Sequence, residues 1–385
     1  MNFEFATADR IVFGAGALQG IGPAYKGRSK RPLVVTGANP ARAERLLSLL
    51  LQNAMQPVIF SVPGEPELST VEQGTALARA EQCDRVFGFG GGSVIDAAKA
   101  IAAMMTNEGG LLDYLEIIGQ AKPLTKRPAP FIAIPTTAGT GAEVTRNAVL
   151  ASPEHKVKVS LRSPMMLPVL ALVDPELTYD LPPALTASTG MDALTQLIEP
   201  YVCRRANPMT DGYCTEGIRR AARSLRLAYQ EGTTNRAARE DMAMASLLGG
   251  MSLANAGLGA VHGFAGPIGG SFPAPHGAVC AILLPDVMKA NIRALRERDE
   301  RSWALRRYYQ LARWLTNNPH ATADAGGEWV TKLVADLQIP RLGTYGIRAE
   351  HIPDLVAKAQ NASSMKANPI VLTPEELAES LRRAI

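Results

Sequence analysis

Short apolar runs rich in Val, Ile and Phe recur along the first half of the chain. They cover residues 32–36, 57–62, 85–89, 131–135 and 169–173. Stretches with helical spacing separate several of them, at residues 42–53, 71–82 and 94–105. Strands that alternate with helices at this spacing predict a parallel sheet with helices on both faces.

The pattern changes after about residue 183, where the β-branched runs stop and helical spacing takes over. Residues 293–314 predict one amphipathic, heavily charged surface helix. With 385 residues, the chain is longer than a single hydrophobic core usually supports. The sequence therefore predicts an α/β domain over residues 1–183 and an all-helical domain over residues 184–385, joined near the segment 181–192.

A long segment, residues 242–285, contains no Lys, Arg, Asp or Glu and carries two of the five histidines, His262 and His276. A run this rich in small uncharged residues is typical of a buried, closely packed segment. A membrane helix is excluded because Asn255, Pro267 and the many glycines leave no run of about 20 strongly apolar residues. Buried imidazoles need partners, so each histidine either bonds to the backbone or faces a metal ion. Their spacing matches no zinc-finger or metalloprotease motif.

Composition and charge narrow the class of protein further. Hydrophobic residues make up 46% of the chain and charged residues 20%, as in an ordinary globular protein. The net charge is only +4, and the densest basic stretch predicts a solvated helical face rather than a nucleic-acid site. Its members are Arg204, Arg205, Arg219, Arg220, Arg223 and Arg226.

The cysteines and the N-terminus indicate the cellular compartment of the protein. The four cysteines are Cys83, Cys203, Cys214 and Cys280. They lie far apart without a Cys-x-x-Cys pair, so they indicate neither a disulfide framework nor a sulfur metal site. The N-terminus has an early acidic residue and no apolar core of signal-peptide length. We therefore expect a cytoplasmic protein that binds neither membrane nor nucleic acid.

The sharpest motif, residues 86–99, runs from an apolar strand through four glycines into a helix, with Ser93 at a predicted N-cap position. Glycines let the backbone approach an anion, and a helix N-terminus offers free N–H groups and a positive dipole end. These properties favour pyrophosphate binding. The segment is not a Walker loop, and it matches Gly-x-Gly-x-x-Gly only with Ser93 as the last member. A tight turn without a ligand is the alternative.

A second glycine-rich turn follows the strand that ends at Pro135, and gathers Thr136, Thr137 and Thr140. Ligands of open α/β sheets bind beyond the carboxyl ends of strands, so two such turns indicate a nucleotide site. A purely structural loop is the alternative here. Further on, Asp192 and Gln196 stand four residues apart and would share one helical face, from which both could point at one object. An acidic residue near a helix N-terminus is the alternative for Asp192.

Together these motifs resemble the iron-containing (group III) alcohol dehydrogenase family. The resemblance runs from Arg10 to Pro369, and residues 90–99 and 134–143 are its most specific parts. It implies a Rossmann-like NAD(P)-binding domain followed by a helical metal domain, as in the dehydroquinate synthase-like fold. It also implies that the cofactor contacts Gly90, Gly91, Gly92, Ser93, Asp96, Thr136, Thr137 and Thr140.

Members of that family hold a divalent metal with an Asp, a His four residues later and two further His. Here Asp192, His262 and His276 fill three of these places, and the resemblance marks them as the catalytic residues. Gln196 occupies the fourth place, where an amide oxygen is a weaker ligand than imidazole. We expect iron, zinc or manganese, with looser binding, a shifted metal preference, or no metal at all.

Two further departures concern the substrate and the cofactor. Gly266 stands where the family often has another His in the substrate pocket, which leaves space for a bulkier substrate. Gly37 follows the strand at residues 33–36, where NAD-preferring members usually carry Asp. Without that carboxylate a 2′-phosphate is not repelled, so NADP should be tolerated or preferred over NAD.

The resemblance thus predicts an oligomeric NAD(P)-dependent oxidoreductase that interconverts a small alcohol and an aldehyde or ketone by metal-assisted hydride transfer. Three alternatives stay open. They are a maleylacetate-reductase-like keto-acid reductase, a dehydroquinate-synthase-like lyase or cyclase that uses NAD transiently, and a nucleotide-binding protein that has lost catalysis through Gln196 and Gly266.

Overall fold

The computed structural model describes residues 2–155 and 157–385, which form two compact units. One unit comprises Ala6–Thr137 and Gly141–Thr178. The other comprises Tyr179–Ile385 together with Ala138–Thr140 and the N-terminal residues up to Phe5. The first is an α/β unit and the second is helical, so the predicted fold class is confirmed. The predicted boundary at residue 183 lies just inside the helical unit.

The α/β unit is built on a six-stranded, wholly parallel sheet in the order β1-β8-β5-β4-β2-β3. Its strands are β1 (Ile11–Phe13), β2 (Pro32–Thr36), β3 (Val58–Ser61), β4 (Arg85–Gly90), β5 (Phe131–Pro135) and β8 (Leu170–Val173). Its helices are α1 (Ile21–Tyr25), α2 (Glu44–Gln52), α3 (Leu68–Ala80) and α4 (Gly92–Thr106). All five strands predicted from the apolar runs are present.

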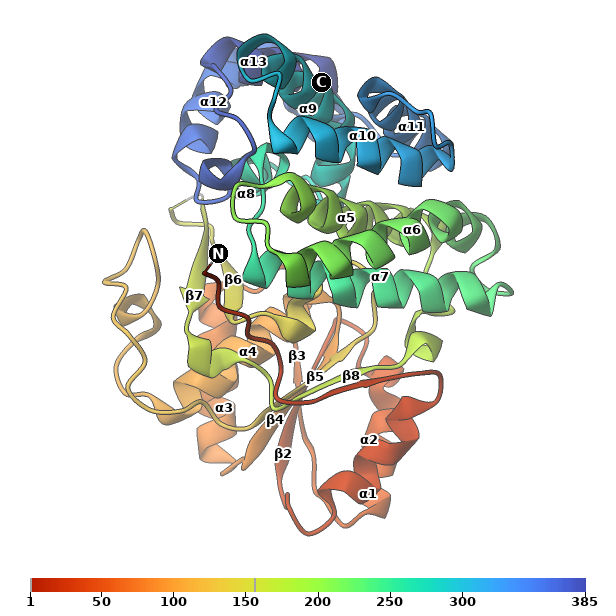
Figure 1. Cartoon of the computed structure of the whole chain (residues 1–385). Coiled ribbons are helices and arrows are strands. Elements are labelled where there is room, and N and C mark those ends of the chain that lie inside the picture. Colours follow the sequence, from red (N-terminus) through yellow and green to blue (C-terminus); the bar gives the residue numbers. More distant parts are fainter. Residues whose placement is uncertain (1, 156) are drawn as a thin grey trace. The chain divides into compact units, whose positions relative to one another are not determined.

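Helices cover both faces of this sheet because both faces of its central strands are apolar (Figure 1). Successive side chains of a strand point to opposite faces. Leu33 and Val35 of β2 therefore join the core formed with α3 and α4, whereas Val34 joins the core formed with α1 and α2. This continuous burial explains why the strands read as uninterrupted apolar runs.

Two features of this unit were not predicted. β1 is only three residues long, too short for a periodicity signal. The strands β6 (Asn147–Ser152) and β7 (Val157–Arg162) form a separate antiparallel hairpin. Alternate residues of β6 are buried, so only one of its faces packs on a core, whereas both faces of the central strands are buried.

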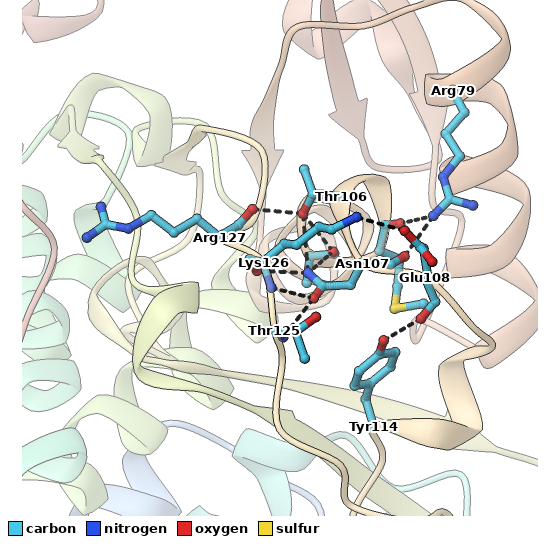
Figure 2. Close-up of polar contacts among 10 residues, drawn as sticks. Arg79, Thr106, Asn107, Glu108, Tyr114, Thr125, Lys126 and Arg127 are labelled. Carbon is cyan, nitrogen blue, oxygen red and sulfur yellow. Dashed lines mark hydrogen bonds and ion pairs between the residues drawn. The ribbon is translucent and has the colours of Figure 1, made fainter.

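The loop after α4 is held by Asn107, which is fully buried (Figure 2). Its Nδ2 atom donates to the carbonyls of Ala103 and Lys126, 2.9 Å away in each case. Its Oδ1 atom accepts from the backbone N–H groups of Thr125 and Lys126 at 3.0 Å. One side chain thus ends the helix and fixes the returning chain ahead of β5.

The helical unit contains nine α-helices among the described residues. They are α5 (Pro183–Val202), α6 (Pro208–Glu231), α7 (Arg236–Asn255), α8 (Ala260–Ser271), α9 (His276–Arg298), α10 (Trp303–Thr316), α11 (Ala323–Asp336), α12 (Ile352–Asn361) and α13 (Pro374–Ala384). The prediction of a single helix over residues 293–314 is wrong. The chain breaks between α9 and α10, where the Ser302 hydroxyl accepts from the N–H of Ala304 and starts a new helix.

The uncharged segment 242–285 forms the end of α7, all of α8 and the start of α9, and most of it is buried. Within the described residues, no single helix is long and apolar enough to cross a membrane. Only α7 and α8 taken together pass that test, and they are bent by 96° at the break between them. The arginines of α6 lie at the surface as predicted, and Arg220 and Arg223 both pair with Asp241.

Candidate functional site

Three side chains that lie far apart in the sequence converge within the helical unit. Asp192 lies on α5, His262 on α8 and His276 at the first residue of α9. The Oδ1 atom of Asp192 is 3.5 Å from Nε2 of His262 and 3.6 Å from Nε2 of His276. The centroids of the two imidazole rings are 5.4 Å apart. The structure therefore brings together the three residues expected to be catalytic.

Helix α5 directs polar side chains to this point although most of its buried surface is apolar. Asp192, Gln196 and Glu199 follow one another at spacings of four and three residues, which places them on one helical face. All three are buried, and α5 packs against α6, α7 and α9. Burial of the apolar residues thus determines where these three polar groups point.

Cys280 is a fourth group at this point, and the sequence analysis missed it. Its Sγ atom lies 3.8 Å from Nε2 of His262 and 3.7 Å from Nε2 of His276. The ligand-type atoms of Asp192, His262, His276 and Cys280 all lie within 4.8 Å of one another. A thiol thus lies within the candidate metal cluster, although the cysteine spacing indicated no sulfur site. The available signal was the spacing of four residues between His276 and Cys280, which puts both on one face of α9.

Glu199 holds His262 in place and was also missed. Its Oε2 atom accepts a 2.6 Å hydrogen bond from Nδ1 of His262, and its Oε1 atom accepts one of 2.8 Å from the backbone N–H of Val261. The first bond leaves Nε2 of His262 without a proton in the neutral ring and turned toward Asp192. A carboxylate behind a histidine is the common arrangement that orients metal-binding imidazoles. Spacing along α5 could have indicated Glu199, since it stands seven residues after Asp192.

Burial and the attraction between opposite charges have opposite effects on the pKa values of this cluster. Burial raises the pKa of the Asp192 carboxyl, but His276 and His262 more than offset this and bring that pKa below its usual value. Burial likewise raises the pKa of the Cys280 thiol, and the same two imidazoles bring it below its usual value. Burial lowers the pKa of His262, yet Cys280, Glu199 and Asp192 raise it well above its usual value. The acidic groups and the imidazoles of this cluster thus shift one another's pKa values toward their charged forms.

The donor set fits a divalent metal ion. Oδ1 of Asp192 has no hydrogen-bond partner in the described structure although its residue is only 2% exposed, and a buried orphan oxygen is costly. The separations of 3.5 and 3.6 Å from Asp192 to the imidazoles are long for direct N–H···O bonds. Together with the S···N distances of 3.8 and 3.7 Å from Cys280, which also allow weak hydrogen bonds, they are similar to edges of a coordination tetrahedron. The centre of a tetrahedron with such edges lies about 2.2 Å from each corner, within the range of metal–N, metal–O and metal–S bonds.

Gln196 and Gly266 have different surroundings. Gln196 helps to lower the pKa of the Asp192 carboxyl, while its Oε1 atom is buried without a partner among the described residues. Gly266 precedes Pro267 inside α8, where a side chain on the residue before proline would crowd the ring. Apart from its chain neighbours and its own helix, no heavy atom lies within 4 Å of a Cβ built at Gly266.

The predicted cofactor-binding turns follow three adjacent parallel strands of the α/β unit. Gly37 follows β2, Gly90 ends β4 with residues 91–93 directly after it, and Thr136 follows β5. The N–H of Thr136 donates to the carbonyl of Gly90 at 2.9 Å, and Thr137 lies 3.4 Å from a Cβ built at Gly91. Thr140 belongs to the short stretch Ala138–Thr140 that groups with the helical unit.

Helix α4 begins at Gly92 with Gly91 as its N-cap, so the prediction of Ser93 as N-cap is wrong. Gly91 makes no side-chain cap bond, which leaves the first N–H groups of the helix available for an anion. Gly90 has to be glycine, because a Cβ there would lie 2.6 Å from Cβ of Val94. Asp96 does not face solvent freely, since its Oδ2 atom accepts from the N–H of Val149 at 3.1 Å.

Lys99 fastens the second turn to α4. Its buried Nζ atom donates to the Ala142 carbonyl at 2.9 Å, to Oγ1 of Thr145 at 2.9 Å and to the Asn147 carbonyl at 2.7 Å. Burial lowers the pKa of Lys99 to about 8, against the opposing effect of Asp96. Burial also raises the pKa of the nearby Glu143 to about 7. These groups shape the two turns and are not exposed to a ligand.

Comparisons with known proteins agree with this geometry. A sequence model described as iron-containing alcohol dehydrogenase matches residues 8–175, and a model of that family's C-terminal domain matches residues 186–385. The 1,3-propanediol dehydrogenase of Klebsiella pneumoniae is 35% identical over 395 residues, covering 99% of this chain and 98% of the relative. Alcohol dehydrogenase 4 of Schizosaccharomyces pombe is 35% identical over 380 residues, covering 97% of this chain and 87% of the relative.

Solved structures show the same likeness over the full length. The crystal structure of a 1,3-propanediol oxidoreductase superposes with a TM-score of 0.92 at 34% identity, and each chain covers 100% of the other. An alcohol dehydrogenase from Oenococcus oeni gives a TM-score of 0.91 at 32% identity, again with complete coverage.

The chain belongs to the iron-containing alcohol dehydrogenase family. It is an NAD(P)-dependent oxidoreductase that interconverts an alcohol with an aldehyde or ketone. These matches support alcohol dehydrogenase activity over the lyase and keto-acid reductase alternatives. A divalent metal and a nicotinamide cofactor are implied by the family.

Proposed function

We propose that Asp192, His262 and His276 bind the divalent metal ion of this alcohol dehydrogenase, and that iron, zinc or manganese can occupy the site. The observation that carries the proposal is the convergence of Oδ1 of Asp192 with the Nε2 atoms of both histidines at 3.5 and 3.6 Å. An ion held there supplies Lewis acidity toward an alcohol or carbonyl oxygen when it is bound.

The chain's own residues prepare that chemistry. Glu199 accepts the Nδ1 proton of His262 and so presents the lone pair of Nε2 toward Asp192. Asp192 contributes a buried negative charge that favours a cation. The apolar residues of α5, α8 and α9 keep Asp192 and His262 away from bulk water, which strengthens electrostatic interactions there, while the side chain of His276 stays 36% exposed.

We infer that Gly90, Gly91, Gly92 and Ser93 bind the pyrophosphate of the cofactor, with Thr136, Thr137, Thr140 and Asp96 along it. Support comes from the uncapped N-terminus of α4 and from the pairing of β4 with β5, which sets the two turns side by side. Gly37 carries no carboxylate at the end of β2, so the chain accepts NADP as well as NAD.

The open space at Gly266 leaves room for a bulkier substrate than a pocket with a histidine at this position would accept. The named relatives include dehydrogenases of 1,3-propanediol, of choline and of long-chain alcohols, so the family accommodates varied alcohols. We propose a small-molecule alcohol and its carbonyl product as substrates of this chain. A homo-oligomeric state and a cytoplasmic location stay predictions, and light scattering on the purified protein measures the first.

Reconstitution tests the metal proposal. Chelator-treated protein is loaded with Fe(II), Zn(II) or Mn(II), analysed for metal content, and assayed for NADH and NADPH oxidation on a panel of aldehydes and ketones. We expect metal content to approach one ion per chain and turnover to return with at least one ion. Asp192→Asn should lose both, whereas Asp211→Asn, which removes a carboxylate paired with Arg307, should keep the metal. Absence of both metal and turnover in the unaltered protein would refute the proposal.

A further inference from the structure

Cys280 lies among the proposed metal ligands, but the proposed function assigns it no role. We propose that the Cys280 thiolate, and not Gln196, is the fourth protein ligand of the metal ion, and that it biases the site toward zinc and cobalt. This inference rests on the proposed metal site and specifies its chemistry.

The geometry places sulfur at the open corner of the ligand set. Sγ of Cys280 is nearly equidistant from the two Nε2 atoms, at 3.7 and 3.8 Å, and these separations match those from Oδ1 of Asp192 to the same nitrogens. Cys280 is 0% exposed and stands one turn after His276 on α9, so one rigid helix presents both groups. The unpartnered Oδ1 of Asp192 is an independent sign that this cluster accommodates a ligand.

Gln196 offers the metal only its amide oxygen, because an amide nitrogen has no lone pair available for a cation. That oxygen is buried without a partner among the described residues and lies 3.6 Å from a Cβ built at Gly249 of α7. The Cys280 thiol instead lies within 3.8 Å of both imidazoles. In this assignment, sulfur from another helix takes the place of the histidine expected four residues after Asp192.

Charge balance favours the same assignment. Two anionic ligands, Asp192 and Cys280, with two neutral imidazoles neutralise a divalent ion, and the thiol proton leaves for solvent. A set with the amide in place of the thiolate would carry one negative charge fewer, and Glu199 behind His262 would have to balance it from outside the ligand set. A thiolate is also a soft ligand, which suits zinc and cobalt better than manganese or magnesium. Tetrahedral zinc sites can expand to five ligands when a substrate oxygen binds.

Cobalt spectroscopy tests this assignment without relying on turnover. The metal-free protein is titrated with Co(II), and visible and near-ultraviolet absorption are recorded together with bound cobalt. We expect the visible ligand-field bands of a tetrahedral site and an intense thiolate-to-cobalt charge-transfer band. Cys280→Ala and Cys280→Ser should lose the charge-transfer band. Gln196→Ala should keep it, as should Cys214→Ala, which removes a buried thiol of α6 outside the cluster.

Zinc affinity gives a second measurement. Chelator competition should show at least about tenfold weaker zinc binding in Cys280→Ala, while manganese affinity changes less. Circular dichroism identifies any variant that fails to fold. In that case the cobalt absorption spectrum of the unaltered protein alone shows whether a thiolate binds the metal. Stoichiometric tetrahedral cobalt without a charge-transfer band would overturn the role of Cys280 and leave the metal site standing. Failure of the unaltered protein to bind cobalt at all would instead overturn the proposed metal site.

Discussion

Replacement of Glu199 by glutamine isolates the contribution of the group behind His262. The substitution keeps the shape of the side chain and removes its charge. Glu199 is 5% exposed and makes two hydrogen bonds, to Nδ1 of His262 at 2.6 Å and to the N–H of Val261 at 2.8 Å. A glutamine has one acceptor oxygen for these two donors, because its nitrogen can only donate.

The magnitude follows from these two bonds. Loss of a carboxylate that orients a metal-binding histidine costs about 10- to 100-fold in metal affinity, or about 1.4–2.8 kcal/mol. One buried N–H group also loses its acceptor, which lowers the free energy of unfolding by about 1–3 kcal/mol. Glu199→Gln should therefore weaken metal binding and destabilise the metal-free protein at the same time.

Chelator competition at fixed pH measures the affinity, and urea unfolding of the metal-free protein measures the stability. Glu143→Gln is the matched control, since it also neutralises a buried carboxylate but in the α/β unit. It should leave metal affinity unchanged. If Glu199→Gln folds and binds zinc within about twofold of the unaltered protein, the reasoning that Glu199 positions His262 is refuted.

Three further predictions concern the cofactor, pH and helix packing. Gly37→Asp should shift kcat/KM from NADPH toward NADH by more than tenfold, because like charges about 6 Å apart repel by about 3 kcal/mol at an effective dielectric constant of about 20; an unchanged ratio would contradict the role of Gly37. Burial raises the pKa of Glu143 to about 7. The carboxyl therefore contributes fully to the free energy of unfolding below the pKa that it has in the unfolded chain, and this contribution is lost as pH rises through 7. Glu143→Gln should therefore reduce the change of the free energy of unfolding with pH, measured in urea between pH 5 and 8. An equal change in the unaltered protein and the variant would contradict the raised pKa of Glu143. On α6, Gly212→Ala should raise the free energy of unfolding by about 0.5–1 kcal/mol, because its Cβ would meet nothing within 4 Å. Gly217→Ala should lower it by about 1–3 kcal/mol, because its Cβ would lie 2.5 Å from Cδ2 of Leu197; equal stabilities would contradict this packing.

The limits of sequence reasoning appear at particular residues. The strands around Val34, Phe87 and Ile132 were predictable because each buries consecutive side chains on both faces of the sheet. The hairpin β6–β7 was not, because half of its residues face away from a core. The break before α10 was missed because the polar run 296–302 resembles the exposed face of one helix, whereas the capping hydroxyl of Ser302 starts a new helix.

The sequence by itself determined the α/β-then-helical order, the two glycine-rich turns and the residues Asp192, His262 and His276. The order of the units and the turns follow from local rules, since periodicity and backbone freedom act over a few neighbouring residues, whereas the family resemblance marked the three residues. Only the tertiary structure decided that Cys280 joins the cluster and that Glu199 stands behind His262. A ligand set drawn from α5, α8 and α9 depends on how three helices pack, and that packing is the summed result of many distant apolar contacts rather than of any single motif.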